Sequence, residues 1–158
     1  MSGRTLVLGL GNPILGDDGV GWRVVERVRG QVESPEVEVD CFAGGGLSLM
    51  ERLVGYDRAI LVDVTITGQR PPGSVCALAL EQLADPAVGH VSSPHDVTLQ
   101  TALLLGRALG IRLPDRITIV GVEVETSYEF AEELTAPVAA AVPRAVQLTL
   151  DELRRSVG

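Results

Sequence analysis

The sequence predicts an α/β fold: a single three-layer α/β/α domain with a mostly parallel central sheet of about five strands and helices on both faces. Short apolar segments alternate along the chain with longer segments whose apolar residues recur at helical spacing. The short segments are apolar on both faces, which is typical of strands buried between two helical layers. At 158 residues the chain has the length of one domain, and we expect residues 1–158 to form a single unit.

The first half of the chain predicts three strands and two helices. Strands are expected at 5–9, where TLVLG ends in glycine, at 36–42, where apolar and polar residues alternate, and at 58–64. The last of these is a continuous apolar run that carries an aspartate near its end. Valines at helical spacing predict an amphipathic helix that starts near residue 20, and a glycine run precedes a second helix at 47–54.

The second half predicts two more strands and two more helices. A Pro-Pro-Gly turn leads into a strand at 74–80, and the last clear strand is expected at 116–122. Leucine and alanine predict a helix at 97–109, and a long final helix is expected at 136–155. Because proline disrupts a helix interior, we expect this last helix to bend or restart at Pro143.

The composition excludes several classes of function. The formal net charge is −8 and aromatic residues make up 3%, so the chain is a poor candidate for binding nucleic acid or an anionic membrane. Its two cysteines cannot build a disulfide framework and form no C-x-x-C pair. No apolar stretch is long enough to span a bilayer. We therefore expect a cytoplasmic protein without membrane insertion and without a nucleic-acid partner.

Polar residues gather where the predicted strands end. Right-handed crossovers place the loops that follow parallel strands at one edge of the sheet, where the sites of such folds form. Asp17 and Asp18 lie in the loop after the first strand, Asp63 ends the most apolar strand, and His95 lies after the fourth strand. Two carboxylates and one imidazole suit a borderline divalent metal such as nickel, zinc, iron or copper. Ligand type alone does not choose among these metals.

His95 belongs to the segment Ser93-Pro94-His95-Asp96. The segment predicts a helix start with Ser93 as the N-cap, Pro94 as the first helical residue and Asp96 as the capping-box partner. His95 would then lie in the first turn, where the positive end of the helix disfavours the imidazolium. The neutral ring is the form that binds a metal.

Each candidate also has a purely structural interpretation. Aspartates are good N-caps, so we expect either Asp17 or Asp18 to cap the first helix while the other stays available. Burial of Asp63 is costly unless something uses the carboxylate. A histidine such as His95, taken alone, is more often a loop residue than a ligand. The joint placement at one edge is what favours a site.

Three further features are interpreted as structural. The Gly-Leu-Gly run at 9–11 resembles part of a dinucleotide-binding fingerprint, but its third glycine is misplaced and the two aspartates would repel a pyrophosphate. Cys41 and Cys76 have no histidine beside them in sequence, so we expect buried small apolar residues rather than nucleophiles. Glu123 and Glu125 come just past the last predicted strand, where they could add negative potential to the same edge of the sheet, but a solvated loop is the commoner explanation.

The ordered motifs resemble those of hydrogenase maturation proteases. The segment GLGNPILGDDGVG at 9–21 is similar to the N-terminal signature of that family. The resemblance continues through LVDV at 61–64, SPH at 93–95, VGV at 120–122 and LTAPV at 134–138. It therefore covers nearly the whole chain, with matching length and element order.

The resemblance implies an endopeptidase that removes a C-terminal extension from the large-subunit precursor of a nickel-iron hydrogenase after nickel has been installed. It implies Asp18, Asp63 and His95 as both the catalytic residues and the metal ligands. Nickel would be supplied by the precursor, and the isolated protein need hold no metal. Two departures stand out: the family often has the longer glutamate at position 18, and the segment at 43–46, AGGG, lacks the threonine of the usual Gly-Gly-Thr.

The residues leave the chemistry of cleavage open. No serine, cysteine or lysine stands in an evident nucleophile-and-base pair, which disfavours covalent catalysis. A metal could polarise the scissile carbonyl or lower the pKa of a water, or one aspartate could act as the general base. Two other classes of function remain: a non-cleaving metal-sensing chaperone or binding module, and, less favoured, a small nucleotide-binding domain.

Overall fold

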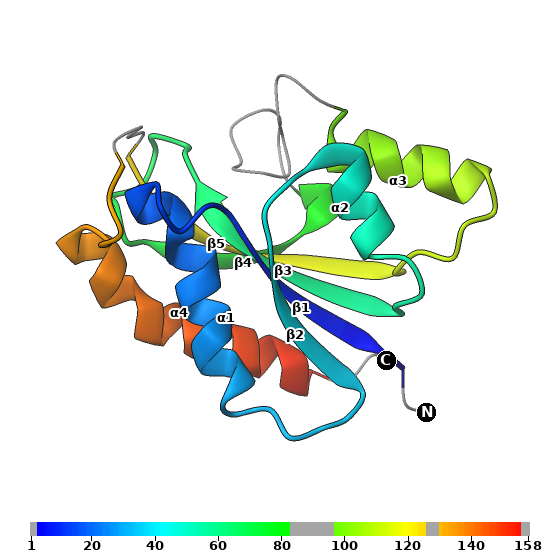
Figure 1. Ribbon diagram of the computed structural model, residues 1–158, viewed down its shortest axis with the longest axis horizontal. Helices are drawn as coiled ribbons and strands as arrows, with labels where there is room; N and C mark the ends of the chain where they lie inside the picture. Colours follow the sequence, from blue (N-terminus) through cyan, green and yellow to red (C-terminus); the bar gives the residue numbers. More distant parts are fainter. Residues whose placement is uncertain (1–2, 83–96, 126–129, 156–158) are drawn as a thin grey trace.

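A five-stranded sheet forms the centre of the molecule in this computed structural model, which describes residues 3–82, 97–125 and 130–155. Its strands are β1 (Thr5–Leu10), β2 (Val37–Phe42), β3 (Arg58–Thr65), β4 (Val75–Ala79) and β5 (Arg116–Glu123). They lie in the order β2-β1-β3-β5-β4, and all are parallel except β4, which runs antiparallel to β5 at one edge (Figure 1). The predicted mostly parallel sheet is confirmed.

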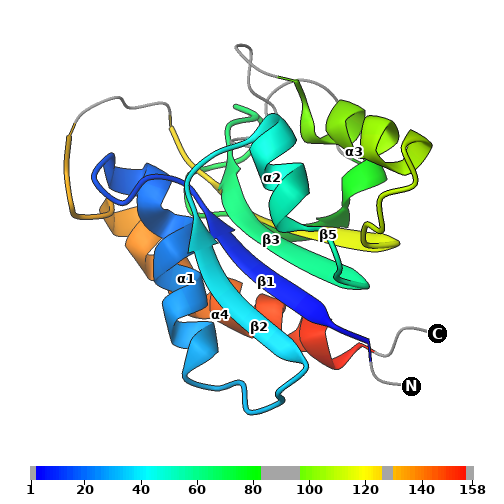
Figure 2. The same ribbon diagram turned by 45° about the vertical axis from the view of Figure 1, so that its right-hand side comes forward.

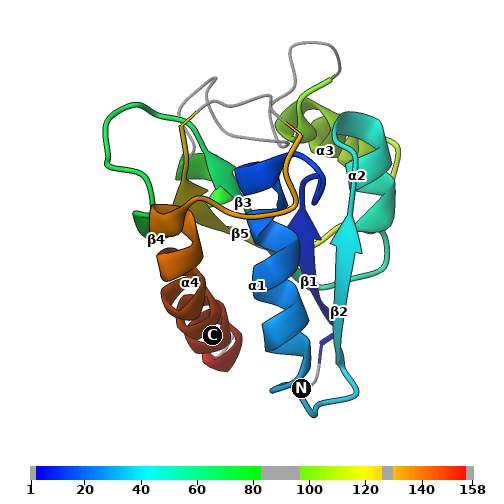
Figure 3. The same ribbon diagram turned by 60° about the vertical axis from the view of Figure 1, so that its left-hand side comes forward.

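A pair of helices covers each face of the sheet. The helices are α1 (Val20–Arg29) and α4 (Ala136–Arg154) on one face, and α2 (Gly46–Arg52) and α3 (Leu99–Ala108) on the other (Figures 2 and 3). Short 3-10 turns lie at η1 (Gly16–Gly19) and η2 (Leu80–Gln82). The three-layer arrangement is the predicted one. In the part of the chain described, no helix is long and apolar enough to cross a membrane.

The alternation of side chains along the strands divides the core into two clusters. In β1, Leu6 and Leu8 join a leucine-rich cluster under α2 and α3, while Val7 joins a valine-rich cluster under α1 and α4. Every residue of β3 is buried, because helices cover both sides of this central strand. That burial explains why the segment is apolar almost throughout and makes the aspartate near its end conspicuous.

The third helix starts later than predicted. α3 begins at Leu99, where Thr98 is the N-cap and accepts a hydrogen bond from the Thr101 amide at 3.1 Å. A side-chain cap of this kind satisfies one of the unpaired amides of the first helical turn, which fixes the start. The expected cap, Ser93, lies outside the described residues.

The last helix does not restart at its proline. α4 runs through Pro143 as one helix of 19 residues. A proline removes one backbone donor from a helix, but packing can offset that loss. The neighbouring Val142 and Ala145 are buried in the valine-rich cluster, which holds both sides of the proline against the sheet and α1.

Candidate functional site

The carboxyl ends of β1 and β3 mark the point where the strand order reverses. From β1 the chain crosses through α1 to β2, and from β2 it returns through α2 to β3 on the other side of β1. A crevice forms where successive connections diverge in this way, and ligand sites of α/β sheets lie there. Two of the predicted site residues belong to this point: Asp18 in η1, which follows β1, and Asp63 near the end of β3.

Close backbone contacts hold the first turn of α1 against these strand ends. A Cβ atom on Gly21 would lie 2.4 Å from the carbonyl oxygen of Val62, so only glycine permits this approach. On the other side of the contact, a Cβ atom on Gly9 would lie 2.5 Å from the Gly21 carbonyl oxygen. Gly21 closely follows Asp18, Val62 directly precedes Asp63, and η1 lies against β3. The glycines therefore bring the Asp18 loop and the Asp63 strand to the same edge of the sheet.

The two adjacent aspartates of the first loop have different partners. Asp18 is half-buried, and its Oδ2 accepts a hydrogen bond from the Asn12 amide at 2.9 Å across the loop. Asp17 accepts from Thr135, whose amide lies 2.7 Å from Oδ1 and whose hydroxyl lies 2.8 Å from Oδ2. Because Thr135 is the N-cap of α4, Asp17 anchors the start of the last helix.

Neither aspartate caps the first helix, so that expectation is wrong. The turn η1 runs directly into α1, whose N-cap is Gly19, and no side chain bonds to the cap position. The reason is that η1 supplies a carbonyl partner itself: the Val20 amide donates to the carbonyl oxygen of Asp17. Both carboxylates can therefore bond elsewhere.

Residues 130–135, called the strap below, tie the first loop to the start of α4. The Gly16 amide donates to the Ala131 carbonyl oxygen at 2.6 Å, and the Ala131 amide donates to the Ile14 carbonyl oxygen at 3.0 Å. Gly16 has a φ of 59°, in the left-handed region that favours glycine. Together with the hydrogen bonds of Asp17, the strap fixes the loop that carries the second aspartate.

Asp63 is fully buried near the carboxyl end of β3. Its exposed fraction is 0%, and its Oδ1 accepts a hydrogen bond from the Val64 amide at 2.8 Å. Alternation along the strand places its side chain on the same face as Leu61, under α2 and α3. A carboxylate at this depth is retained only where hydrogen bonds or a cation offset the loss of hydration.

Both histidines, His90 and His95, lie outside the described residues. Among the residues that the structure does describe, no three histidine, cysteine, aspartate or glutamate side chains form a group that could hold a metal ion. The described part of the predicted set is Asp18 and Asp63. The complete set with His95 therefore stays a prediction.

Glu123, the last residue of β5, is a buried carboxylate next to the end of β3. It is 2% exposed, and its Oε1 accepts hydrogen bonds from the hydroxyls of Thr65 at 2.8 Å and Thr67 at 3.0 Å. Its Oε2 accepts from the amides of Thr67 at 2.9 Å and Gly68 at 3.1 Å. Burial raises the pKa of Glu123, but these hydrogen bonds outweigh burial and hold its pKa below the usual range.

The expectation that Glu123 lies in a solvated loop is therefore wrong, whereas Glu125 is exposed as expected. The alternation of inward-facing and outward-facing side chains along β5 could have predicted the burial of Glu123. Glu123 continues the alternate positions of Ile117 and Ile119, which face the leucine-rich cluster. A glutamate at the next inward position points into the protein.

The two cysteines are half-buried and free. Burial raises the pKa of the Cys41 thiol, which disfavours the thiolate that a nucleophile needs. Cys76 sits in β4 opposite Gly121 of β5. The expected full burial of the two cysteines is therefore wrong, although Cys41 does pack against the valine-rich cluster.

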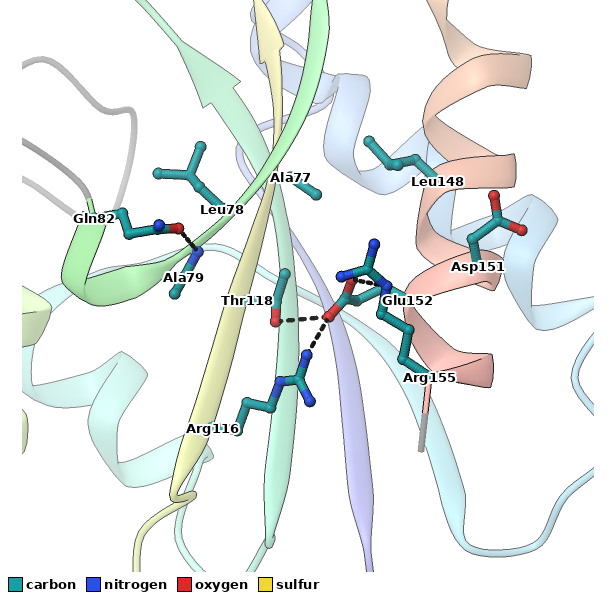
Figure 4. Close-up of a pocket in the computed structure, with 10 residues that line it drawn as sticks. All are labelled: Ala77, Leu78, Ala79, Gln82, Arg116, Thr118, Leu148, Asp151, Glu152 and Arg155. Atoms are coloured by element: carbon teal, nitrogen blue, oxygen red, sulfur yellow. Dashed lines mark hydrogen bonds and ion pairs between the residues drawn. The ribbon is translucent and has the colours of Figure 1, made fainter. Parts of the chain in front are cut away.

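A polar pocket of about 290 Å³ lies at the other end of the sheet, where β5 begins (Figure 4). Its buried Glu152 accepts hydrogen bonds from Arg116 and the Thr118 hydroxyl, both at 3.2 Å, and the Arg155 side chain approaches at 3.7 Å. Beside it, Arg58 donates to the carbonyl oxygens of Glu152 and Arg155. Cationic donors at the last carbonyls stabilise a helix C-terminus, so we assign this cluster to the anchoring of α4.

Comparisons with known proteins agree with one another. A family model described as hydrogenase maturation protease (HycI) matches residues 22–152. The hydrogenase 2 maturation protease of Escherichia coli K12 is 32% identical over 155 residues, which cover 97% of this chain and 92% of that protein.

Solved structures show the same likeness. The hydrogenase maturating endopeptidase HybD from Escherichia coli matches with a TM-score of 0.79 at 30% identity, covering 96% of this chain and 92% of that one. A hydrogenase 2 maturation peptidase from a Thaumarchaeota archaeon matches with a TM-score of 0.69 at 29% identity, covering 96% and 98%.

Proposed function

This chain belongs to the hydrogenase maturation protease family, and from that premise we propose that it is an endopeptidase acting on a hydrogenase precursor. It removes a C-terminal extension from the large-subunit precursor of a nickel-iron hydrogenase, in the cytoplasm, after nickel has been inserted. The named relatives support the processing of a hydrogenase. The large subunit as partner, the role of nickel and the compartment are parts of the proposal.

We assign Asp18, Asp63 and His95 to the reaction. The observation that carries this assignment is the close approach of Gly21 to the Val62 carbonyl, which supports a shared site for the two aspartates. Two carboxylates and an imidazole suit nickel among other borderline divalent metals. Nickel belongs to the precursor, so the three side chains recognise it as part of the substrate.

Cleavage adds one water across the scissile peptide bond. The water oxygen bonds to the carbonyl carbon, the C–N bond breaks, and the leaving amine takes up a proton. An aspartate can accept the proton of the water as a general base. Alternatively, the nickel of the substrate polarises the carbonyl or lowers the pKa of the water. Both routes depend on the same three side chains.

The test measures the C-terminal mass of nickel-loaded precursor after incubation. Asp18→Asn, Asp63→Asn and His95→Ala are each expected to lower the cleavage rate at least about 100-fold while unfolding stays cooperative. Asp115→Asn is the matched control, because Asp115 is exposed and lies just before β5, at the opposite end of the sheet. Undiminished cleavage by any of the first three variants would remove that residue from the mechanism.

Nickel-free precursor separates this function from the other classes. A nickel-reading peptidase cleaves the loaded precursor and leaves the nickel-free form intact. A chaperone or binding module instead binds the loaded precursor and leaves its mass unchanged. A nucleotide-binding domain would be stabilised by nucleotides in a thermal-shift assay, although the close contact of Gly9 with the Gly21 carbonyl already gives that glycine a structural reason.

A further inference from the structure

We propose that Glu123 is a positioning residue of this peptidase, which holds the chain that leaves β3 and thereby fixes Asp63. The inference rests on the proposed function, because Asp63 matters here as a group of the reaction. Glu123 acts through the residues that follow Asp63 and not through contact with the substrate.

Both oxygens of Glu123 serve one short segment, residues 65–68. One oxygen accepts the two threonine hydroxyls, and the other accepts two consecutive amides, those of Thr67 and Gly68. These amides lie beyond Thr65, the last residue of β3, so sheet pairing does not reach them. The buried carboxylate of Glu123, from the neighbouring strand, accepts these two amides in place of a strand partner. It therefore holds the chain beyond the end of the sheet.

The sheet register connects this anchor to Asp63. Between β3 and β5, Thr65 pairs with Glu123 and Asp63 pairs with Gly121. Thr65 shares a face with Asp63, two residues earlier in the strand. A Cβ atom on Gly121 would lie 2.5 Å from Cγ2 of Thr65, so the threonine leans over the glycine toward the level of Asp63. Glu123 therefore holds the side chain that borders Asp63 at the carboxyl edge.

Loss of the hydrogen bonds to Glu123 would release the chain after β3 without creating a cavity in the apolar core. The amides of Thr67 and Gly68 would lose the carboxylate that accepts from them, and because Thr67 is half-buried and Gly68 is exposed, this stretch of chain would rearrange toward water. Displacement of a catalytic group by about 1 Å can lower a rate about 100-fold. We therefore expect the effect on kcat to exceed the effect on KM.

Two substitutions of Glu123 separate positioning from general stability. In Glu123→Gln the amide oxygen can accept from both backbone amides while the NH2 group donates to the threonine hydroxyls, which rotate to accept. We expect its kcat on nickel-loaded precursor to stay within about threefold of wild type. Glu123→Met has similar volume and no acceptor, and we expect kcat to fall at least about 30-fold with KM within about twofold. Glu125→Met, at the exposed neighbour, keeps wild-type values.

Thr65→Val tests the same anchor through a smaller change. It keeps the shape of the side chain and removes one hydroxyl, so it remains informative if Glu123→Met does not fold. We expect kcat about tenfold lower with cooperative unfolding retained. Wild-type kcat in folded Glu123→Met or in Thr65→Val would overturn the proposal, and so would equal losses in Glu123→Gln and Glu123→Met.

Amide hydrogen exchange keeps this inference separable from the proposed function. If the wild-type protein leaves the precursor uncut, the proposed function fails, and exchange still tests the anchor. Glu123→Met is expected to accelerate exchange at Thr67 and Gly68 at least about tenfold, while amides inside β3 such as that of Ile60 stay protected. Thr65→Val is expected to accelerate exchange at the same two amides by a smaller factor, while the amides inside β3 again stay protected. Unchanged exchange at Thr67 and Gly68 would overturn the anchor whatever the activity.

Discussion

Asp17 and Asp18 show how local backbone geometry gives neighbouring, chemically identical residues different roles. Both lie in η1, a 3-10 turn, in which successive side chains are about 120° apart around the axis. Asp17 is therefore directed to Thr135 at the start of α4, while Asp18 bonds back across its own loop to Asn12. The sequence alone shows two good helix caps in a row, and only the turn type decides which one reaches the other helix.

The role of Asp17 predicts a measurable loss of stability. Asp17→Ala removes an acidic acceptor next to the N-terminal end of α4, so we expect the free energy of unfolding in urea to fall by about 1 kcal/mol. The control is Asp151→Ala, an exposed residue near the other end of the same helix, which we expect to change stability by less than about 0.5 kcal/mol. Equal losses in the two variants would contradict this role.

At the scale of elements, the site depends on how tightly α1 docks on the sheet. The helix reaches the ends of β1 and β3 because Gly9 and Gly21 leave no side chains between the backbones. Its valines at 20, 24, 25 and 28 are all 0% exposed, so the rest of the helix is held by apolar packing. The valine spacing predicts the helix, but it does not predict how closely the helix approaches the sheet. A glycine in the sequence can serve a flexible loop or a close backbone contact, and the sequence alone does not distinguish the two.

Gly21→Ala is therefore expected to lower the free energy of unfolding by about 1–3 kcal/mol, since the new methyl group meets a backbone carbonyl that cannot move freely. The matched control is Gly30→Ala at the C-cap of the same helix. There φ is −69° and the nearest atom to an added Cβ lies 3.6 Å away. We expect this control to be neutral or stabilising by up to about 1 kcal/mol. Urea unfolding of both variants measures the contrast.

At the scale of the whole molecule, the fold was predictable and the long-range polar contacts were not. Strand positions follow from apolar runs such as 58–64, because burial on both faces leaves a pattern within the segment itself. The hydrogen bonds from Thr135 to Asp17 join residues 118 positions apart, and no local pattern records such a partner. The same reason explains why Glu123 was expected in solvent: its partners belong to a different strand and to the turn after it.

The shared sheet also predicts that the two core clusters unfold together. Leu61 lies in the leucine-rich cluster, and the single tryptophan, Trp22, lies in α1 on the other face. Leu61→Ala is expected to cost about 2–5 kcal/mol and to shift the unfolding transitions of Trp22 fluorescence and far-UV circular dichroism by the same amount. Separate midpoints for the two probes would contradict a single domain over residues 1–158.

The strap gives the fold a consequence for protein engineering. Ile14 and Gly16 near the N-terminus share hydrogen bonds with Ala131 near the C-terminus, so these two stretches form one composite surface. Consider a chimera that takes residues 130–135 from a related chain but keeps the original stretch at 11–19. Its two hydrogen-bonded stretches would come from different parent proteins. Exchange of either stretch between such chains therefore preserves these hydrogen bonds best when both stretches are grafted as a pair.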